Sequence, residues 1–300
     1  MTQVSNPAPH LLVTGAAGFV GRAVVSRARA LGLSVTAVTR QHGDQRDPRW
    51  LAALVADTAP DIAIDAAGII PGTRQQDVAQ NIALTQAWLD ALGQLARPPR
   101  LVLSGSAAVY GKGAATGRAT RETDPMQPSS DYGRAKLAAL EMAHEAHQKH
   151  GLDVQTGIIF NLVGAGQACH LAPQVFIGRA MAASDQPLGV ANIGDVRDFV
   201  DVDDVADALI AMALRSQAGS VANVATGKPT RISDLLTLIC TITGREWQSI
   251  KDPVNPTPNY ICYGDPSLLH AMTGWTPKFD LRQSLNRAIL AHEIGRPSPC

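Results

Sequence analysis

A tyrosine and a lysine four residues apart form the pair with the clearest chemical use in this sequence. Tyr132 and Lys136 open the segment YGRAKLAALEMAHEAHQKHG, whose pattern predicts a long helix. Residues at this spacing share one face of a helix. A free phenol titrates at a pH of about 10, and a neighbouring ammonium group lowers that pKa by stabilising the phenolate. The pair is therefore suited to acid/base catalysis near neutral pH.

A serine hydroxyl completes the predicted catalytic set. Ser106 follows the apolar run RLVLS at residues 100–104, which predicts a buried strand. At a strand end its hydroxyl can orient a substrate oxygen that exchanges a proton with the phenol. A turn-rich segment with Pro125 and Pro128 separates this strand from Tyr132. We predict Ser106, Tyr132 and Lys136 as catalytic residues.

The stretch LLVTGAAGFVG at residues 11–21 predicts a place for a phosphate group. Short apolar residues lead into Gly15, Gly18 and Gly21, which are spaced three apart and precede the helical pattern RAVVSRARALG. A strand, a tight glycine turn and a helix start present unpaired N–H groups and the positive end of the helix dipole. A purely structural turn would also use glycines. Because of its position between strand and helix, we interpret it as a dinucleotide site.

The residue that closes the next predicted strand bears on which dinucleotide binds. The β-branched run LSVTAVTR at residues 33–40 predicts a strand that ends on Arg40. An acidic residue there bonds the ribose 2′-hydroxyl, whereas an arginine can bind a 2′-phosphate. Arg40 therefore favours NADP(H), with NAD(H) possible. The alternative is a solvated arginine at a strand end.

Strands alternate with helices along the first half of the chain. DIAIDA at 61–66 predicts a buried strand that runs into AAG at 66–68, with a short helix at 50–57 before it and an amphipathic helix at 77–95 after it. This alternation predicts parallel βαβ units, hence an α/β fold with a doubly wound, Rossmann-type parallel sheet. In such sheets ligands bind at the carboxyl ends of strands. The glycine turn, Arg40, AAG and Ser106 all occupy such ends.

Composition narrows the class of protein. The chain has 300 residues, with 26 basic and 26 acidic side chains, so it offers no electrostatic case for binding nucleic acid or a membrane surface. Its four cysteines show neither metal-ligand spacing nor a disulfide pattern, and no metal site is expected. Residues 1–10 lack the features of a signal peptide, and no apolar run is long enough to span a bilayer. We expect a soluble cytoplasmic protein.

The motifs GAAGFVG, SGSAAVYG and YGRAK together closely resemble the extended short-chain dehydrogenase/reductase family, the NAD-dependent epimerases, dehydratases and reductases of nucleotide sugars. The resemblance continues through FNLVGAGQ at 160–167, VRDFVDVDDVADAL at 196–209, VANVATGKPTRISDLL at 221–236 and GDPSLLHAMTGWTPKFDL at 264–281. It therefore covers nearly the whole chain. It implies that the catalytic trio is the one predicted above, with Lys136 also holding the nicotinamide ribose.

The resemblance also implies the remaining site residues. The cofactor-binding set comprises Gly15, Ala17, Gly18, Phe19, Val20, Arg40, Asp44, Gln45, Ala66, Ala67, Gly68, Ser104, Tyr132, Lys136 and Phe160. Within it, Asp44 would lie near the adenine and Phe160 near the nicotinamide. The substrate-binding set comprises Ser106, Asn161, Arg179 and Arg197. Arg197 would bind the diphosphate of a nucleotide sugar, since a guanidinium group grips phosphate oxygens in pairs.

Domain organisation and assembly follow from the same resemblance. It implies a Rossmann-type cofactor domain from residues 1–160 and 192–226. A smaller, mixed α/β substrate domain would comprise residues 161–191 and 227–300. Members of the family often form homodimers by pairing two long helices, here near 77–95 and 132–150, so a homodimer is expected.

Within the family, the motif order is most similar to GDP-6-deoxy-D-mannose reductases and related 4-keto-sugar reductases. Ile158 stands where such reductases usually carry an arginine, Ala165 replaces a proline, and only Lys251 is basic near the segment before GDPS. The base-binding end of the pocket is therefore expected to differ. The leading hypothesis is an NADP(H)-dependent reductase of a 4-keto-6-deoxy nucleotide sugar. An epimerase or dehydratase and a non-catalytic NADP-binding regulator are the alternatives.

Overall fold

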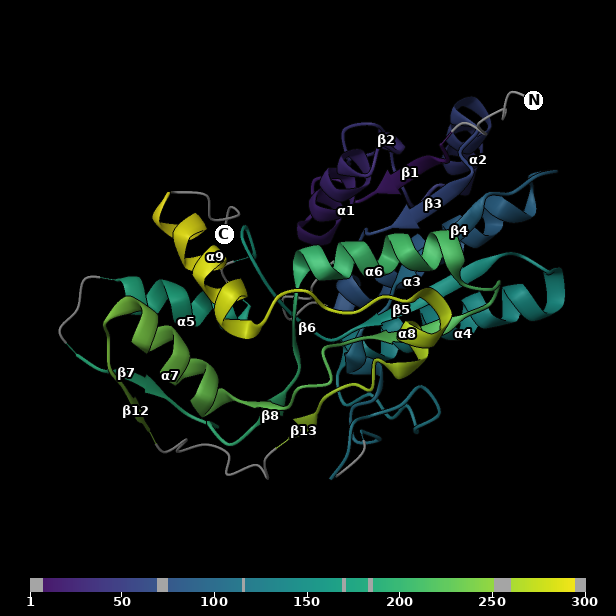
Figure 1. Ribbon diagram of the computed structural model, residues 1–300. Coiled ribbons are helices and arrows are strands. Elements are labelled where there is room, and N and C mark those ends of the chain that lie inside the picture. The colour runs from purple at the N-terminus through teal and green to yellow at the C-terminus, as the bar shows by residue number, and fades with distance from the viewer. Residues whose placement is uncertain are drawn as a thin grey trace, which may run out of the picture.

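The computed structural model describes residues 8–68, 75–114, 117–168, 171–182, 186–250 and 260–294. Its centre is a six-stranded sheet in which every neighbouring pair is parallel (Figure 1). The strand order is β10-β5-β4-β3-β1-β2. These strands are β1 (His10–Thr14), β2 (Ser34–Ala37), β3 (Ile62–Asp65), β4 (Arg100–Ser104), β5 (Val154–Ile159) and β10 (Val221–Val224). The predicted fold class, a Rossmann-type parallel α/β sheet, is confirmed.

Helices cover both faces of this sheet, because successive strand residues point to opposite sides. Leu11 and Val13 of β1 pack into the core beneath α1 (Phe19–Ala30) and α6 (Val202–Arg215). Leu12 between them packs on the other face, which is covered by α2 (Pro48–Thr58), α3 (Gln75–Gly93) and α4 (Asp131–His150). The glycine turn between β1 and α1 is thereby held at the carboxyl edge of the sheet.

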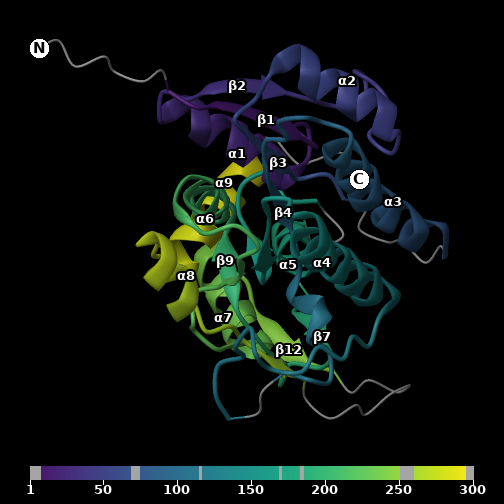
Figure 2. The same cartoon turned by 90° about the vertical axis from the view of Figure 1, so that its right-hand side faces the viewer.

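Elements from the second half of the chain form another cluster beside the sheet, seen below and to the left in Figure 1. In Figure 2 this cluster lies on the side away from the viewer. Helices α5 (Ala172–Met181), α7 (Ile232–Thr243) and α9 (Leu281–Glu293) share an apolar core of their own with β7 (Leu188–Val190), which pairs with β12 (Trp247–Ser249). The short helix α8 (Ser267–Thr273) instead packs against α6.

Short strands connect this cluster to the central sheet. Strand β6 (Asn161–Val163) pairs with β9 (Phe199–Asp201), and β8 (Val196–Arg197) lies between β11 (Thr230–Arg231) and β13 (Ile261–Cys262). A single 3₁₀ turn, η1 (Ala107–Val109), follows β4. The small strands carry the segments for which a substrate role is predicted.

Element boundaries differ from the sequence prediction chiefly at β2. The strand ends at Ala37, three residues before Arg40, instead of extending to residue 40. The Val38 N–H still donates to Val13, and Ala16 N–H donates to Val38, but the His42 N–H then closes a turn on Thr39. The predicted strand 61–66 is confined to Ile62–Asp65. The bounds predicted for helices α2, α3 and α4 agree with the structure to within about two residues, the usual uncertainty of helix ends.

Two of the cysteines can be placed. Cys240 and Cys262 are buried free thiols, while Cys169 and Cys300 lie outside the described residues. In the part of the chain that the structure describes, no helix combines the length and apolar character needed to span a membrane.

Candidate active site

The site is centred where the order of the sheet reverses, between β1 and β3. Thr14 at the end of β1 lies opposite Asp65 at the end of β3, and the Thr14 hydroxyl donates to Asp65 Oδ1 at 2.7 Å. The N–H of Ala67 donates to the same oxygen at 3.0 Å. Ligands of doubly wound sheets bind in the crevice at such a switch point. The buried Asp65 carboxyl group ties together the two loops that border this crevice.

The glycine turn (residues 15–21) packs tightly against the end of β3. Gly15 adopts a φ of +66°, and a Cβ there would lie 2.5 Å from the Ala67 nitrogen. A Cβ on Gly21 would lie 2.1 Å from the Gly15 oxygen. These positions accept glycine alone because any side chain would collide with backbone. The close packing of this turn therefore requires glycine at positions 15 and 21.

The start of α1 fits a diphosphate. Its N-cap residue, Gly18, makes no side-chain cap, and the first turn holds no acidic residue. Ala17 and Gly18 are exposed, whereas Phe19 and Val20 are half-buried. Free N–H groups and the helix dipole at such an end favour a negatively charged group. By contrast, side chains cap the starts of α2, α4, α6 and α9.

Helix α4 presents the predicted acid/base pair beside the end of β4. Lys136 Nζ lies 6.0 Å from the centre of the Tyr132 ring and donates to the Ser104 carbonyl at 2.9 Å. Both side chains are half-buried. The Ser104 carbonyl at the end of β4 thus holds the Lys136 ammonium group near the Tyr132 ring. The position of the ammonium group is therefore set by the strand as well as by the helix.

Ser106 is brought to this helix by a close backbone approach. It is half-buried, caps η1, and its Oγ accepts from the Ala108 N–H at 3.3 Å. Helix α4 packs onto η1 through Gly133, where a Cβ would lie 2.5 Å from the Ala108 oxygen. Ser130 caps the helix and accepts from the Gly133 N–H. Glycine next to Tyr132 therefore lets the start of α4 sit against the turn that carries the serine.

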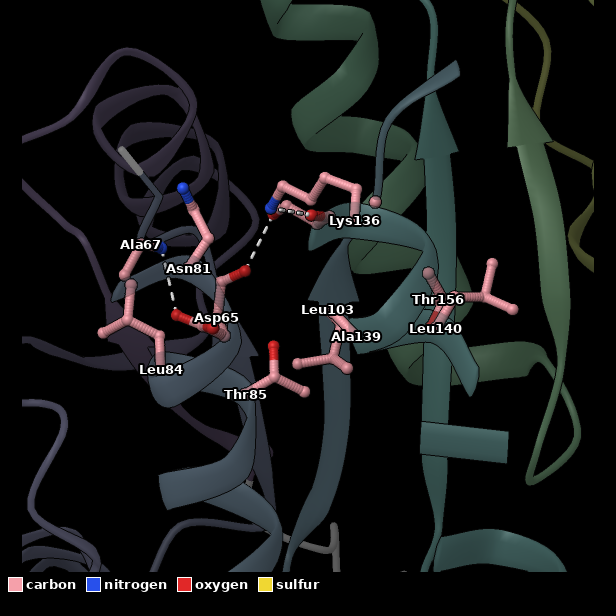
Figure 3. A pocket seen from close by; sticks show the side chains of 12 residues that line it. Asp65, Ala67, Asn81, Leu84, Thr85, Leu103, Lys136, Ala139, Leu140 and Thr156 are labelled. Atoms are coloured by element: carbon pink, nitrogen blue, oxygen red, sulfur yellow. Dashed lines mark hydrogen bonds between the residues drawn. The ribbon is translucent and has the colours of Figure 1, made fainter. Parts of the chain in front are cut away.

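A small cavity of about 10 Å³ is lined in part by Lys136 (Figure 3). Asp65 from β3, Asn81 and Thr85 from α3, Ser104 from β4 and Lys136 from α4 contribute its polar lining. Burial raises the pKa of Asp65, while hydrogen bonds from Thr14 and Ala67 and the charge of Lys136 act in the opposite direction. The cavity is thus lined by one buried acidic side chain, Asp65, and one half-buried basic side chain, Lys136.

The residues predicted for the adenosine end lie past β2. Arg40 is exposed in the turn at residues 39–42. Asp44 is exposed and forms a two-bond ion pair with Arg46, which lowers the pKa of the Asp44 carboxyl. Gln45 is buried, with an exposed fraction of 7%. Ala66 and Ala67 are half-buried and Gly68 is exposed, so that edge is open to a ligand.

The polar residue predicted to touch substrate, Asn161, is held by Asp198. Both its backbone N–H and its side-chain Nδ2 donate to the Asp198 carbonyl, at 3.0 and 3.1 Å. The carboxylate of Asp198 is fully buried and accepts from the N–H groups of Thr226, Gly227 and Gly264 and from the Thr226 hydroxyl. Burial raises the pKa of Asp198, and these hydrogen bonds oppose that effect. Asp198 thus joins three loops beside Asn161.

Both predicted substrate arginines make bonds within the protein. Arg197 donates to the Tyr260 carbonyl at 2.8 Å, pairs with Asp195, and lies 4.4 Å above the Tyr260 ring. Arg179 is exposed on α5 and donates to the Gly189 carbonyl of β7. Neither guanidinium lines the cavity of Figure 3. Binding of a diphosphate by either residue would add to or replace these contacts.

Phe160 is also part of the interior. It is 3% exposed, its ring centre lies 6.1 Å from that of Tyr110, and a Cβ on Gly264 would lie 2.6 Å from the ring. It therefore packs where the end of β5 meets the segment that begins at Gly264.

Sequence reasoning overlooked Asp65 and Asp198. A carboxylate that closes the apolar run DIAIDA was a usable signal, because a charge at the end of a buried strand faces the ligand edge. In RDFVDVDD, four acidic residues alternate with apolar ones. Only the folded structure shows that Asp198, Asp201 and Asp204 are buried, whereas Asp203 is only partly buried.

The fold places the glycine turn, Tyr132 and Lys136 at the carboxyl edge of a Rossmann-type parallel sheet, where ligands of such α/β proteins bind. The chain belongs to the NAD dependent epimerase/dehydratase family, whose model matches residues 11–225. This confirms the predicted enzyme class, an NAD(P)-dependent oxidoreductase or epimerase with a nicotinamide cofactor.

Similar proteins extend over nearly the full chain. A dTDP-6-deoxy-L-talose 4-dehydrogenase (NAD(P)(+)) of Kitasatospora kifunensis is 31% identical over 96% of this chain and 98% of its own. A GDP-6-deoxy-D-mannose reductase of Pseudomonas aeruginosa is 29% identical over 94% and 96%. The solved structure of RMD from Pseudomonas aeruginosa complexed with NADPH matches with a TM-score of 0.84 at 27% identity, covering 96% of this chain and all of that one.

Proposed function

We propose that this protein is an NADP(H)-dependent oxidoreductase that interconverts a keto and a hydroxyl group at carbon 4 of a 6-deoxy nucleotide sugar. The observation that carries the proposal is the anchoring of Lys136 by the Ser104 carbonyl beside Tyr132, at the same sheet edge as the glycine turn. The names of two relatives, a 4-dehydrogenase and a reductase of 6-deoxy sugars, support this reaction class.

In the direction of reduction, the nicotinamide supplies a hydride to the keto carbon when the cofactor is bound. Tyr132 donates its phenolic proton to the carbonyl oxygen, so the C=O group becomes CH–OH and the tyrosine becomes a phenolate. The Lys136 ammonium stabilises that phenolate. The Ser106 hydroxyl orients the substrate oxygen. Oxidation is the reverse, with the phenolate accepting the hydroxyl proton.

The glycine turn would hold the diphosphate, through Gly15, Ala17, Gly18 and the start of α1. Ala66, Ala67 and Gly68 would border the cofactor at the end of β3, with Phe160 behind the nicotinamide end. Arg40 favours NADP(H), because its exposed guanidinium lies past the end of β2, where a 2′-phosphate would be placed. In the same loop, Arg46 is paired with Asp44. Arg40, by contrast, makes no side-chain hydrogen bond or ion pair with the residues that the structure describes.

We further propose that residues 161–191 and 227–300 bind the nucleotide sugar, with residues 1–160 and 192–226 binding the cofactor. Asn161 and Arg197 would contact the sugar and its diphosphate, and Arg179 is a weaker candidate. A homodimer formed through α3 and α4 is consistent with their position side by side on one face of the sheet. Light scattering coupled to gel filtration tests the dimer.

Consumption of NADPH with a panel of dTDP- and GDP-linked 4-keto-6-deoxy sugars tests the reaction. The proposal predicts stoichiometric NADPH oxidation with at least one of them. Conversion of a nucleotide sugar to its 4-epimer without net NADPH consumption would instead identify an epimerase. Dehydration is disfavoured, because the residues that flank Ser106 are Gly105, Ala107 and Ala108, which provide no second acid.

A further inference from the structure

The buried carboxyl group of Asp65 has no part in the chemistry described so far. It lies at the end of β3, is 4% exposed, and shares the cavity of Figure 3 with Lys136. Its Oδ1 accepts two hydrogen bonds, from Thr14 and from the N–H of Ala67. Burial raises the pKa of Asp65, and these two hydrogen bonds oppose that effect because they stabilise the anion.

We propose that the Asp65 carboxylate is a positioning residue that sets, through Lys136, the pH at which Tyr132 exchanges its proton. The inference deepens the proposed function and rests on its assignment of Tyr132 as the acid/base. A negative charge near the ammonium partly cancels the field that favours the phenolate. The structure therefore assigns Asp65 an effect opposite to that of Lys136.

The cavity makes this coupling strong. At about 10 Å³ it has room for at most about one water molecule, so little solvent separates the two charges. Charges in such surroundings interact several times more strongly than in water. Burial raises the pKa of Asp65, and the nearby Lys136 charge acts in the opposite direction.

Among the residues that the structure describes, no other charged group lines the cavity. Of its twelve lining residues, those from α3, β4 and β5 are uncharged, including Asn81, Thr85, Ser104 and Thr156, and Asp65 and Lys136 carry the two charges. Next to Tyr132, Asp131 forms an exposed ion pair with Arg134 at the start of α4, where solvent screens it. Asp65 is therefore the acidic group best placed to act on Lys136.

Removal of the Asp65 charge should shift the titration of Tyr132 to lower pH. In Asp65→Asn the amide oxygen still accepts from Thr14 and Ala67, but the ammonium is no longer compensated. The hydrogen bond from Lys136 Nζ to the Ser104 carbonyl does not involve Asp65, so it remains in the variant. The phenolate then forms at a pH lower by about half a unit or more.

Two variants separate charge from structure. Thr14→Val loses the hydrogen bond to Asp65 but keeps the ionisable carboxyl group, so it controls for the loss of that bond alone. Asp65→Ser removes the charge while its hydroxyl can accept from the Ala67 N–H in the same local turn. It replaces Asp65→Asn if the amide variant does not fold.

The test is an NMR titration of protein labelled with ¹³C at tyrosine Cζ, from about pH 6 to about pH 10. Tyr132→Phe assigns the signal, and burial raises the pKa of Tyr110 and Tyr260, which separates their signals. A shift to lower pH in an Asp65 variant but not in Thr14→Val supports the proposal. An unchanged midpoint, a shift to higher pH, or an equal shift in Thr14→Val overturns it. The titration needs no substrate, so it remains decisive even if the proposed sugar specificity is wrong.

Discussion

The cofactor edge of the sheet and the substrate side of the molecule are built differently. At the cofactor edge, the groups offered to a ligand are backbone N–H groups, and the glycines that expose them have no room for a side chain. On the substrate side, the groups expected to bind are long side chains that already bond to the protein, as Arg197 does to Asp195. Backbone sites are fixed by the fold, whereas side-chain sites must exchange partners when substrate binds.

The proposed catalytic pair, Tyr132 and Lys136, lies at the cofactor edge, and its loss should give the largest effect. In Tyr132→Phe the proton donor is absent while the ring and the Lys136 anchor remain. We expect kcat to fall by about 10³-fold, measured as NADPH consumption, with the Kd for NADPH changed less than about threefold. Unchanged turnover would show that another group transfers the proton.

Removal of the buried Asp198 carboxylate tests whether the substrate side depends on one anchor. In Asp198→Ala four donors lose their acceptor, including the N–H groups of Thr226 and Gly227. We expect the free energy of unfolding, measured in urea, to fall by about 3 kcal/mol. The exposed Asp57→Ala on α2 is the control, with an expected change below about 0.5 kcal/mol. Equal losses in both variants would contradict the anchoring role.

Arg40 lies at the cofactor edge, but unlike the backbone N–H groups of the glycine turn it would contact the cofactor through a long side chain. We expect Arg40→Asp to lower the preference for NADPH over NADH by about 30-fold, through loss of a charge-assisted bond and repulsion of the 2′-phosphate. The ratio of the two kcat/KM values measures this. Arg282→Asp on α9 makes the same change of charge elsewhere and should leave the ratio unaltered. A wild-type preference for NADH would refute the assignment.

Arg197 gives the smallest expected effect and addresses the substrate half directly. If its guanidinium binds the diphosphate, Arg197→Met should raise KM for the nucleotide sugar about tenfold, with kcat changed less. Arg197→Lys should recover part of that loss by retaining the charge. Equal KM values for the two variants would mean that Arg197 only braces Tyr260 and Asp195.

The same contrast explains what could be predicted from the sequence. Local patterns suffice to predict a site at the glycine turn, Ser106, Tyr132 and Lys136, because each stands at a strand end or at a fixed helical spacing. The strand β4 was placed at its observed bounds, and helix α4 to within one residue.

What local patterns could not show was the pairing of distant residues. Asp65 meets Thr14 across 51 positions, and Asp198 binds Gly264 across 66. The bonds of Arg197 to the Tyr260 carbonyl likewise depend on how β8 and β13 pair. The end of β2 was misplaced because the Thr39–His42 turn interrupts a run of strand-forming residues.

One measurement tests the central claim most directly. NADPH carrying deuterium at the transferable position of nicotinamide carbon 4 is incubated with the protein and a 4-keto-6-deoxy nucleotide sugar, and the product is analysed by mass spectrometry and NMR. The account predicts one deuterium atom at carbon 4 of the sugar for each NADPH consumed, and a rate that collapses in Tyr132→Phe. Deuterium that remains on the cofactor while the sugar is converted would contradict it.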